Sequence, residues 1–255
     1  MPVKLSRRDL EHLGDDPVFL EAGFHLALDL LGGPSDPDAF ETPDGVPVRR
    51  APGGGGAVVT LLAEDDGAVL ARLAADALDA WRTALPAGLV ARYFAPPGAD
   101  VLGLCGTGPV AWACLRALTR ALPTLRRVRV TGPNAVGFAA DAAKRTGLPV
   151  TAAADAGADA DVLAITEPGC ADARRGALVL TTGPAPTWGE HGPRRELAWD
   201  DAVRAVLDGV AAPRADGLLV VLGDNPRTTR WQRSLDGWAL RRAWELDVGL
   251  MFTVD

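Results

Sequence analysis

Hydrophobic residues recur at helical spacing through the first part of the chain and then change to short apolar runs. Residues 6–13 and 16–32 predict two capped helices, each with apolar positions on one face. Residues 34–56 are rich in Pro, Gly and Asp and predict a long loop. A short strand is expected over 57–62, followed by a helix over 70–85 that Pro86 ends.

Strands alternate with helices through the middle of the chain, which is the pattern of a parallel sheet with right-handed crossovers. An apolar strand precedes Gly106, and a last helix is expected over 230–246. The other expected strands are 127–131, 150–152, 161–166, 177–182 and 218–222, and a further helix covers 197–210. The chain is therefore predicted to be an α/β protein with a Rossmann-type parallel sheet over 96–224. A smaller, discontinuous α+β lobe is expected over 1–95, completed by 225–255.

The stretch from Ala99 to Leu118 carries the clearest chemical signal in the sequence. It runs from a strand through a glycine turn into an amphipathic helix, and Gly106, Gly108 and Ala111 fill the small positions of the dinucleotide-binding fingerprint. The N–H groups of such a turn and the helix dipole hold phosphates. We expect the nucleotide to be bound by Gly106, Thr107, Gly108, Pro109, Val110, Thr131, Asn134 and Thr166.

The end of the second strand of the sheet leaves the choice of cofactor open. In NAD-binding folds an acidic residue about 20 residues after the turn binds the ribose hydroxyls, but residues 130–134 read Val-Thr-Gly-Pro-Asn. No Arg follows directly to mark the phosphate of NADP. The predicted cofactor is therefore NAD or NADP.

Composition and charge narrow the class of partner. The 26 basic and 33 acidic residues give a net charge of −7, which disfavours binding to nucleic acid or to anionic membranes. No apolar run approaches the roughly 20 residues of a membrane span. Cys105, Cys114 and Cys170 are odd in number and lack a C-x-x-C spacing, so we expect neither a disulfide framework nor a metal site. A small-molecule substrate and a cytoplasmic location are the predictions.

Several motifs in the same order resemble the ornithine cyclodeaminase and mu-crystallin family. They are Leu5–Leu10, the Trp81-Arg82-Thr83-Ala84 run followed by Ala91–Ala95, the glycine turn Leu104–Ala111, and Arg195-Glu196-Leu197. The resemblance implies a two-lobed protomer, a homodimer joined through the first lobe, and a bound NAD(P).

The same resemblance implies site residues. Arg82 would hold the carboxylate of a substrate, which suits the bidentate geometry of a guanidinium. The family's substrate-binding Lys has no counterpart here; Arg49 and Arg50 stand in that region, but surface solvation is the expected fate of both. By spacing, the acid of the cyclodeaminases falls on Glu190, and His191 beside it could carry a proton.

These observations predict an NAD(P)(H)-dependent oxidoreductase that moves hydride to or from the α-carbon of an amino or imino acid. The catalytic candidates are Arg82, Glu190 and His191. Two alternatives stay open: a catalytically idle nucleotide-binding accessory or sensor protein, and a lyase of the ornithine cyclodeaminase type.

Overall fold

The computed structural model describes residues 2–32, 48–51, 57–63, 65–168, 172–182, 195–208, 217–222 and 228–253. Backbone contacts divide the chain into two compact units, Met1–Arg82 with Asn225–Asp255, and Thr83–Asp224. Helix α3 (Ala75–Phe94) runs across the border between them. No helix in the described ranges is long and apolar enough to cross a membrane.

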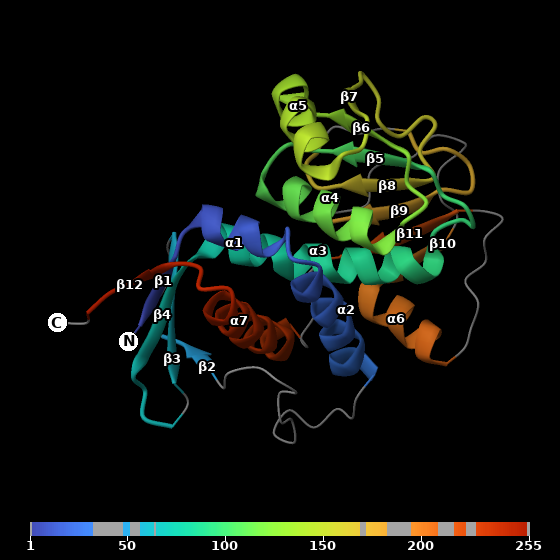
Figure 1. Ribbon diagram of the computed structural model, residues 1–255. Coiled ribbons are helices and arrows are strands. Elements are labelled where there is room, and N and C mark those ends of the chain that lie inside the picture. The colour runs from blue at the N-terminus through green and yellow to red at the C-terminus, as the bar shows by residue number, and fades with distance from the viewer. Residues whose placement is uncertain are drawn as a thin grey trace. The chain divides into compact units, whose positions relative to one another are not determined.

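The first unit is a mixed sheet with helices on one face (Figure 1). Among the described residues, its strands follow the order β12-β1-β4-β3-β2, in which β1 and β4 are parallel and the other pairs antiparallel. Helices α1 and α7 contact this sheet, and α7 also packs against α2. The strands are β1 (Val3–Leu5), β2 (Val48–Arg50), β3 (Val58–Ala63), β4 (Val69–Ala74) and β12 (Leu250–Met251), and the helices are α1 (Arg7–Leu13), α2 (Pro17–Gly32) and α7 (Thr228–Glu245).

Side chains alternate between the two faces of this sheet, as the period of a strand requires. Leu5, Leu61 and Leu73 point to the covered face and are buried, whereas Lys4 and Arg72 are exposed on the opposite face. The covered face forms the core of the unit. Among the described residues, side chains of the opposite face, Lys4 and Arg72 included, are exposed.

The helix starts predicted for the first unit are confirmed by their hydrogen bonds. The Ser6 hydroxyl accepts from the N–H of Asp9, and the Asp9 carboxylate accepts from the N–H of Ser6, which completes a capping box. Asp16 accepts from the N–H groups of Val18 and Phe19 at the start of α2. These contacts satisfy donors that a helix end otherwise leaves without partners.

The helix predicted over 70–85 begins five residues later than expected and does not end at Pro86. Its first part is β4, because Ala71 and Leu73 face the core at strand period while Arg72 faces away. Helix α3 then continues through Pro86 to Phe94. A proline cannot donate to the carbonyl four residues earlier, and the indole Nε1–H of Trp231 donates instead to the carbonyl of Arg82 at 2.9 Å.

The second unit is a parallel sheet with the strand order β10-β11-β9-β8-β5-β6-β7 in the described residues. Its strands are β5 (Val101–Cys105), β6 (Arg127–Thr131), β7 (Val150–Ala152), β8 (Val162–Ile165), β9 (Leu178–Thr181), β10 (Arg195–Ala198) and β11 (Leu218–Val221). From β5 the chain proceeds outward through β6 and β7 and then returns to place β8 on the other side of β5. Ligands of such folds bind outside the carboxyl ends of the strands where the order reverses, which here are the ends of β5 and β8.

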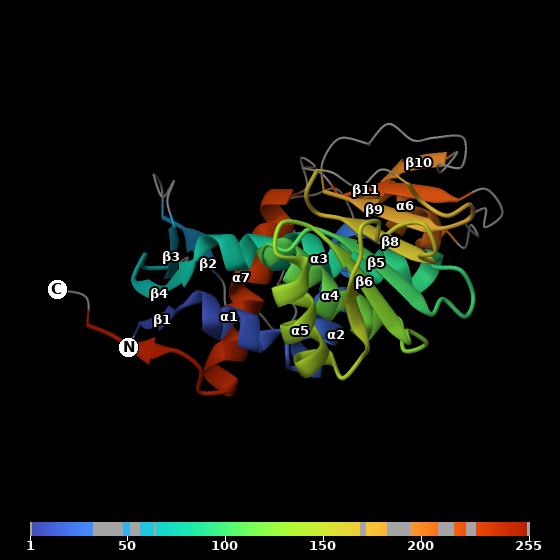
Figure 2. The same ribbon diagram turned by 90° about the horizontal axis from the view of Figure 1, so that it is seen from above.

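Helices α4 (Pro109–Ala121) and α5 (Ala135–Thr146) lie together on one face of this sheet, as both views show (Figures 1 and 2). Gly147 ends α5 in the left-handed conformation, at φ 70°. Helix α6 (Trp199–Leu207) is shorter than predicted because the residues before it form β10, which pairs with β11. The predicted fold class, a Rossmann-type sheet with a smaller α+β lobe, is confirmed.

Candidate functional site

The glycine turn lies at the carboxyl end of β5, at the point where the strand order reverses. Gly106 has φ +124°, a conformation that residues with a side chain rarely adopt, and its N–H donates to the carbonyl of Thr131 at 2.8 Å. A Cβ on Gly106 would lie 2.1 Å from Oγ1 of Thr166. Glycine is therefore required at this position by both conformation and space.

Glu167 also lies at this turn, and the sequence analysis did not identify it as a candidate. It comes two residues after β8, and its Oε1 accepts hydrogen bonds from the N–H of Thr107 at 3.1 Å and of Gly108 at 2.9 Å. Gly108 is the N-cap of α4 and has no side chain with which to cap the helix. A carboxylate oxygen thus occupies the anion position that the turn and the helix dipole create.

The strand order contains the signal that could have identified Glu167. Because β8 pairs with β5 in parallel, the residues that follow the two strands meet at one edge of the sheet. The predicted residue Thr166 shows this directly, since its hydroxyl donates to the carbonyl of Cys105 at 2.9 Å.

The other predicted nucleotide-binding residues lie around the same edge at different distances from the turn. The Thr131 hydroxyl donates over 3.4 Å to the carbonyl of Ala154, and Asn134 is the exposed N-cap of α5. Pro109 and Val110 form the first turn of α4, where a proline costs no helical hydrogen bond. The structure thus brings together Gly106, Thr107, Gly108, Thr131 and Thr166. Nucleotide binding by all eight residues stays a prediction.

Arg82 lies in a group of four charged side chains within the first unit. Its Nη1 is 3.5 Å from Oδ1 of Asp79 on the same helix, and Nη2 of Arg50 is 3.6 Å from that oxygen. Arg50 also pairs with Asp236 of α7 through two hydrogen bonds, Nε–Oδ2 at 2.7 Å and Nη2–Oδ1 at 3.0 Å. Two positive and two negative groups therefore balance one another here.

The expectation that Arg50 is solvated at the surface is wrong. The cause is Asp236, whose side chain is 1% exposed and which requires a positive partner. Burial raises the pKa of Asp236 above its ordinary value, although the Arg50 guanidinium acts in the opposite direction. The neighbouring Arg49 is exposed, as expected.

Glu190 and His191 lie outside the described residues, so their catalytic roles stay predictions. No group of three or more potential metal ligands occurs in the described part of the chain. Cys114 is a buried free thiol, and burial raises its pKa to about 12. Cys105, buried at the end of β5, is disulfide-bonded, which the number and spacing of the cysteines did not predict.

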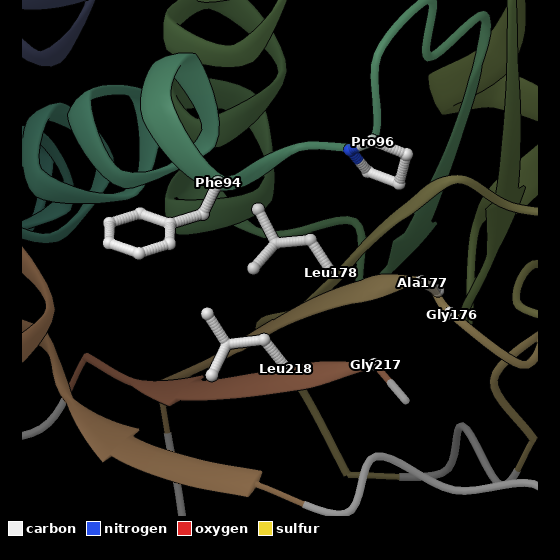
Figure 3. A pocket seen from close by; sticks show the side chains of 7 residues that line it. All are labelled: Phe94, Pro96, Gly176, Ala177, Leu178, Gly217 and Leu218. Carbon is white, nitrogen blue, oxygen red and sulfur yellow. The ribbon is translucent and has the colours of Figure 1, made fainter. Parts of the chain in front are cut away.

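Two cavities in the described residues lie away from the glycine turn. The first, of about 10 Å³, lies at the amino ends of β9 and β11, where the side chains of Phe94, Leu178 and Leu218 gather (Figure 3). It has room for about one water molecule and is at the edge of the sheet opposite to the turn. The second, of about 650 Å³, lies in the first unit and is lined by Lys4, Leu5, Ser6, Val58, Thr60, Arg72, Leu73, Ala74 and Phe252.

The comparison with protein families agrees with the motifs in the sequence. Residues 53–178, which include Arg82, the glycine turn and Glu167, match the model of the ornithine cyclodeaminase/mu-crystallin family. These residues belong to that family. No curated protein matches the chain significantly by sequence.

Several solved structures share the fold of nearly the whole chain. Δ1-pyrroline-2-carboxylate reductase from Thermococcus litoralis, in complex with NADH and L-proline, has 15% identity and a TM-score of 0.67, and the match covers 98% of this chain and 100% of that one. A lysine cyclodeaminase has 18% identity and a TM-score of 0.69 over 100% and 96% of the two chains. An archaeal alanine dehydrogenase dimer with bound NAD has 16% identity and a TM-score of 0.65 over 99% of both. At these identities the likeness shows a shared fold.

Proposed function

We propose that the chain is an NAD(P)(H)-dependent oxidoreductase that acts at the α-carbon of an amino or imino acid. The observation that supports it is the glycine turn at the switch point of the sheet, whose N–H groups hold a carboxylate oxygen. A turn that accepts one anion there has the donors that a pyrophosphate requires. The similar structures also support this proposal, since they include a reductase with NADH and a dehydrogenase with NAD.

The roles of the chain's own residues follow from their chemistry. A nicotinamide supplies hydride when it is bound, and the protein supplies binding, orientation and charge. The turn residues Gly106, Thr107 and Gly108 would hold the phosphates, and Arg82 would pair with the substrate carboxylate. Glu190 or His191 would move a proton at the substrate nitrogen. Binding measurements must decide whether the cofactor is NAD or NADP.

A second candidate function is a nucleotide-binding protein without turnover. It is favoured by Asp79, whose carboxylate lies 3.5 Å from the guanidinium of Arg82 and competes with a substrate carboxylate for it. A third, a lyase of the cyclodeaminase type, has support from the similarity to lysine cyclodeaminase.

We further propose that the protein is a cytoplasmic homodimer joined through the first unit. The open face of its sheet exposes apolar side chains among the charged ones, with Val58 47% exposed and Leu250 71% exposed. In this proposal a second copy of the chain covers these exposed apolar side chains. The dimeric state of the similar alanine dehydrogenase supports a dimer, and analytical ultracentrifugation of the full chain tests the oligomeric state.

The experiment that tests the oxidoreductase proposal measures binding and turnover separately. Fluorescence titration with NADH and NADPH should show binding at micromolar concentrations, and cyclic imines and α-amino acids should then change the nicotinamide absorbance. Turnover of a diamino acid with ammonia release and no net change in absorbance would indicate the lyase. Binding without any turnover would indicate the idle protein, and no binding would refute all three.

The variant Arg82→Ala locates the substrate site. Because it removes charge-assisted hydrogen bonds to a carboxylate, KM should rise about 10- to 100-fold while the Kd for NADH stays unchanged. Arg8→Ala is the matched control, since Arg8 is an exposed arginine of the same unit. An unchanged KM in Arg82→Ala would show that Arg82 does not bind the substrate.

A further inference from the structure

The side chain of Glu167 covers the part of the glycine turn that a phosphate would approach. One oxygen, Oε1, takes the N–H groups of both Thr107 and Gly108. The N–H of Gly106 is already bonded to the carbonyl of Thr131. The residue at the first position of the helix is a proline, which has no N–H. The donors of Thr107 and Gly108 are therefore the ones for which a ligand and Glu167 compete.

Glu167 also fills the space beside the two glycines. A Cβ on Gly108 would lie 3.0 Å from its Oε1, and a Cβ on Gly106 would lie 3.2 Å from its Cγ and Cδ. A fingerprint glycine serves to let a ligand approach the backbone closely. Here the aliphatic part and the carboxylate of Glu167 occupy that approach, so a phosphate oxygen and this side chain compete for the same space beside the glycines.

We propose that Glu167 is a built-in competitor for the phosphates of the nucleotide and thereby sets the affinity of the site. This inference rests on the proposed function, in which a nicotinamide dinucleotide binds at this turn. A phosphate and the carboxylate carry the same sign of charge and use the same two donors, the N–H groups of Thr107 and Gly108, so they compete for them. The apparent Kd then equals the intrinsic Kd divided by the fraction of molecules in which Glu167 has left the turn.

The alternative role of Glu167 is that of a helix cap alone. Gly108 offers no side chain to cap α4, and an acidic group at a helix N-terminus is stabilising. A cap without competition predicts lower stability for a Glu167 variant and no gain in affinity. Competition predicts lower stability together with tighter binding, so the two roles separate in the same variants.

The test compares nucleotide binding by the full-length wild type, Glu167→Ala and Glu167→Gln. NADH and ADP are titrated against each by isothermal calorimetry; ADP carries the phosphates without the nicotinamide. We expect Glu167→Ala to bind both ligands at least about tenfold more tightly, which corresponds to about 1.4 kcal/mol. Glu167→Gln should fall between it and the wild type, because its amide oxygen still accepts from the turn but carries no charge.

Asp141→Asn is the matched control for net charge. Asp141 is exposed on α5 and pairs with Lys144, and its substitution removes the same single charge without touching the turn. It should leave both Kd values unchanged. Hydrogen exchange of the ligand-free proteins gives a readout independent of any ligand, since the amides of Thr107 and Gly108 should exchange faster in Glu167→Ala.

The outcomes separate this inference from the proposed function. If all variants bind NADH with the wild-type Kd, the competitor role is overturned and the oxidoreductase proposal stands. If Glu167→Ala gains affinity for ADP but no protein binds NADH, the competitor role stands and the proposed function is overturned. Weaker binding of both ligands to Glu167→Ala would show that the carboxylate assists the nucleotide, which also overturns the inference.

Discussion

The ion pair between Arg50 and Asp236 gives the sharpest test of the energetics of the first unit. It joins β2 to α7, two elements that lie far apart in the sequence, through two hydrogen bonds of 2.7 Å and 3.0 Å. The Asp236 side chain is 1% exposed, whereas that of Arg50 is 26% exposed. The substitution Arg50→Ala therefore leaves a carboxylate in the core without its positive partner.

The expected loss is about 3–5 kcal/mol of unfolding free energy, the range for removing one partner of a buried pair. The positive charge of Arg82 also acts on the carboxylate of Asp236 and lowers its pKa. The lower end of that range is therefore the better estimate. The double variant Arg50→Met with Asp236→Leu should recover most of the loss. It removes both charges and keeps apolar volume in their place.

The unfolding free energy lost in Arg50→Ala should increase as the pH rises. Burial already raises the pKa of Asp236 above its ordinary value of 3.8, and removing the arginine raises it further. A carboxyl whose pKa is higher in the folded state favours folding while it is protonated, and this contribution disappears as the pH rises through the folded pKa. Arg50→Ala should therefore be closest to the wild type below pH 3.8 and lose stability progressively toward neutral pH.

Urea unfolding of wild type and variants between acid and neutral pH measures these differences. Arg49→Ala is the control, because the exposed Arg49 is the next residue on the other face of β2. It should cost no more than about 0.5 kcal/mol, as for other exposed positions. If Arg50→Ala and Arg49→Ala lose the same free energy at neutral pH, the argument from the buried charge is refuted.

Two further predictions concern backbone strain and helix capping. Gly106→Ala should cost about 2 kcal/mol or more, because its Cβ would collide with a threonine hydroxyl and φ is positive, and NADH binding should be lost with it. Gly98→Ala, at φ +73° with open space around it, should cost only about 1 kcal/mol; equal losses in thermal unfolding would show that the collision has no effect. Asp16→Ala should cost about 2 kcal/mol at neutral pH, since it removes the cap of α2 and the partner of Arg242. Desolvation raises the pKa of Asp16, but the hydrogen bond from Arg242 and two backbone N–H groups outweigh it and lower the pKa below 3.8. The cost should therefore decrease as the pH falls through the folded pKa, and a constant cost in acid unfolding curves would contradict this explanation.

The fold of the second unit was largely predictable from the sequence because its signals are local. Strand β6 begins and ends at the predicted residues 127 and 131, and Gly147 ends α5 as a left-handed C-cap. Strands β5, β8, β9 and β11 are short apolar runs between turn residues, so the pattern needs no knowledge of the partner strands. The parallel sheet itself followed from the alternation of strands with helices.

The sequence pattern did not predict the elements whose identity depends on tertiary contacts. In β4 the residues Leu70, Leu73 and Ala74 fit the helical period, and only pairing with β1 and β3 makes the segment a strand. Strands β10 and β12 lie at sheet edges, where a few backbone hydrogen bonds to one neighbour define them. Arg50 was misjudged for a related reason, since its partner Asp236 lies 186 positions away.

The same distinction between local signals and tertiary contacts applies to the candidate site. A motif reports the residues that follow one strand, so Gly106 and Gly108 could be identified from the turn alone. Glu167 lies 59 positions beyond Gly108 and reaches the turn only because β8 pairs with β5. Two chains with the same glycine turn can therefore differ in nucleotide affinity through the residue that follows the neighbouring strand. For proteins of this fold, the phosphate site is better defined by the ends of both strands at the switch point than by the glycine motif of the first.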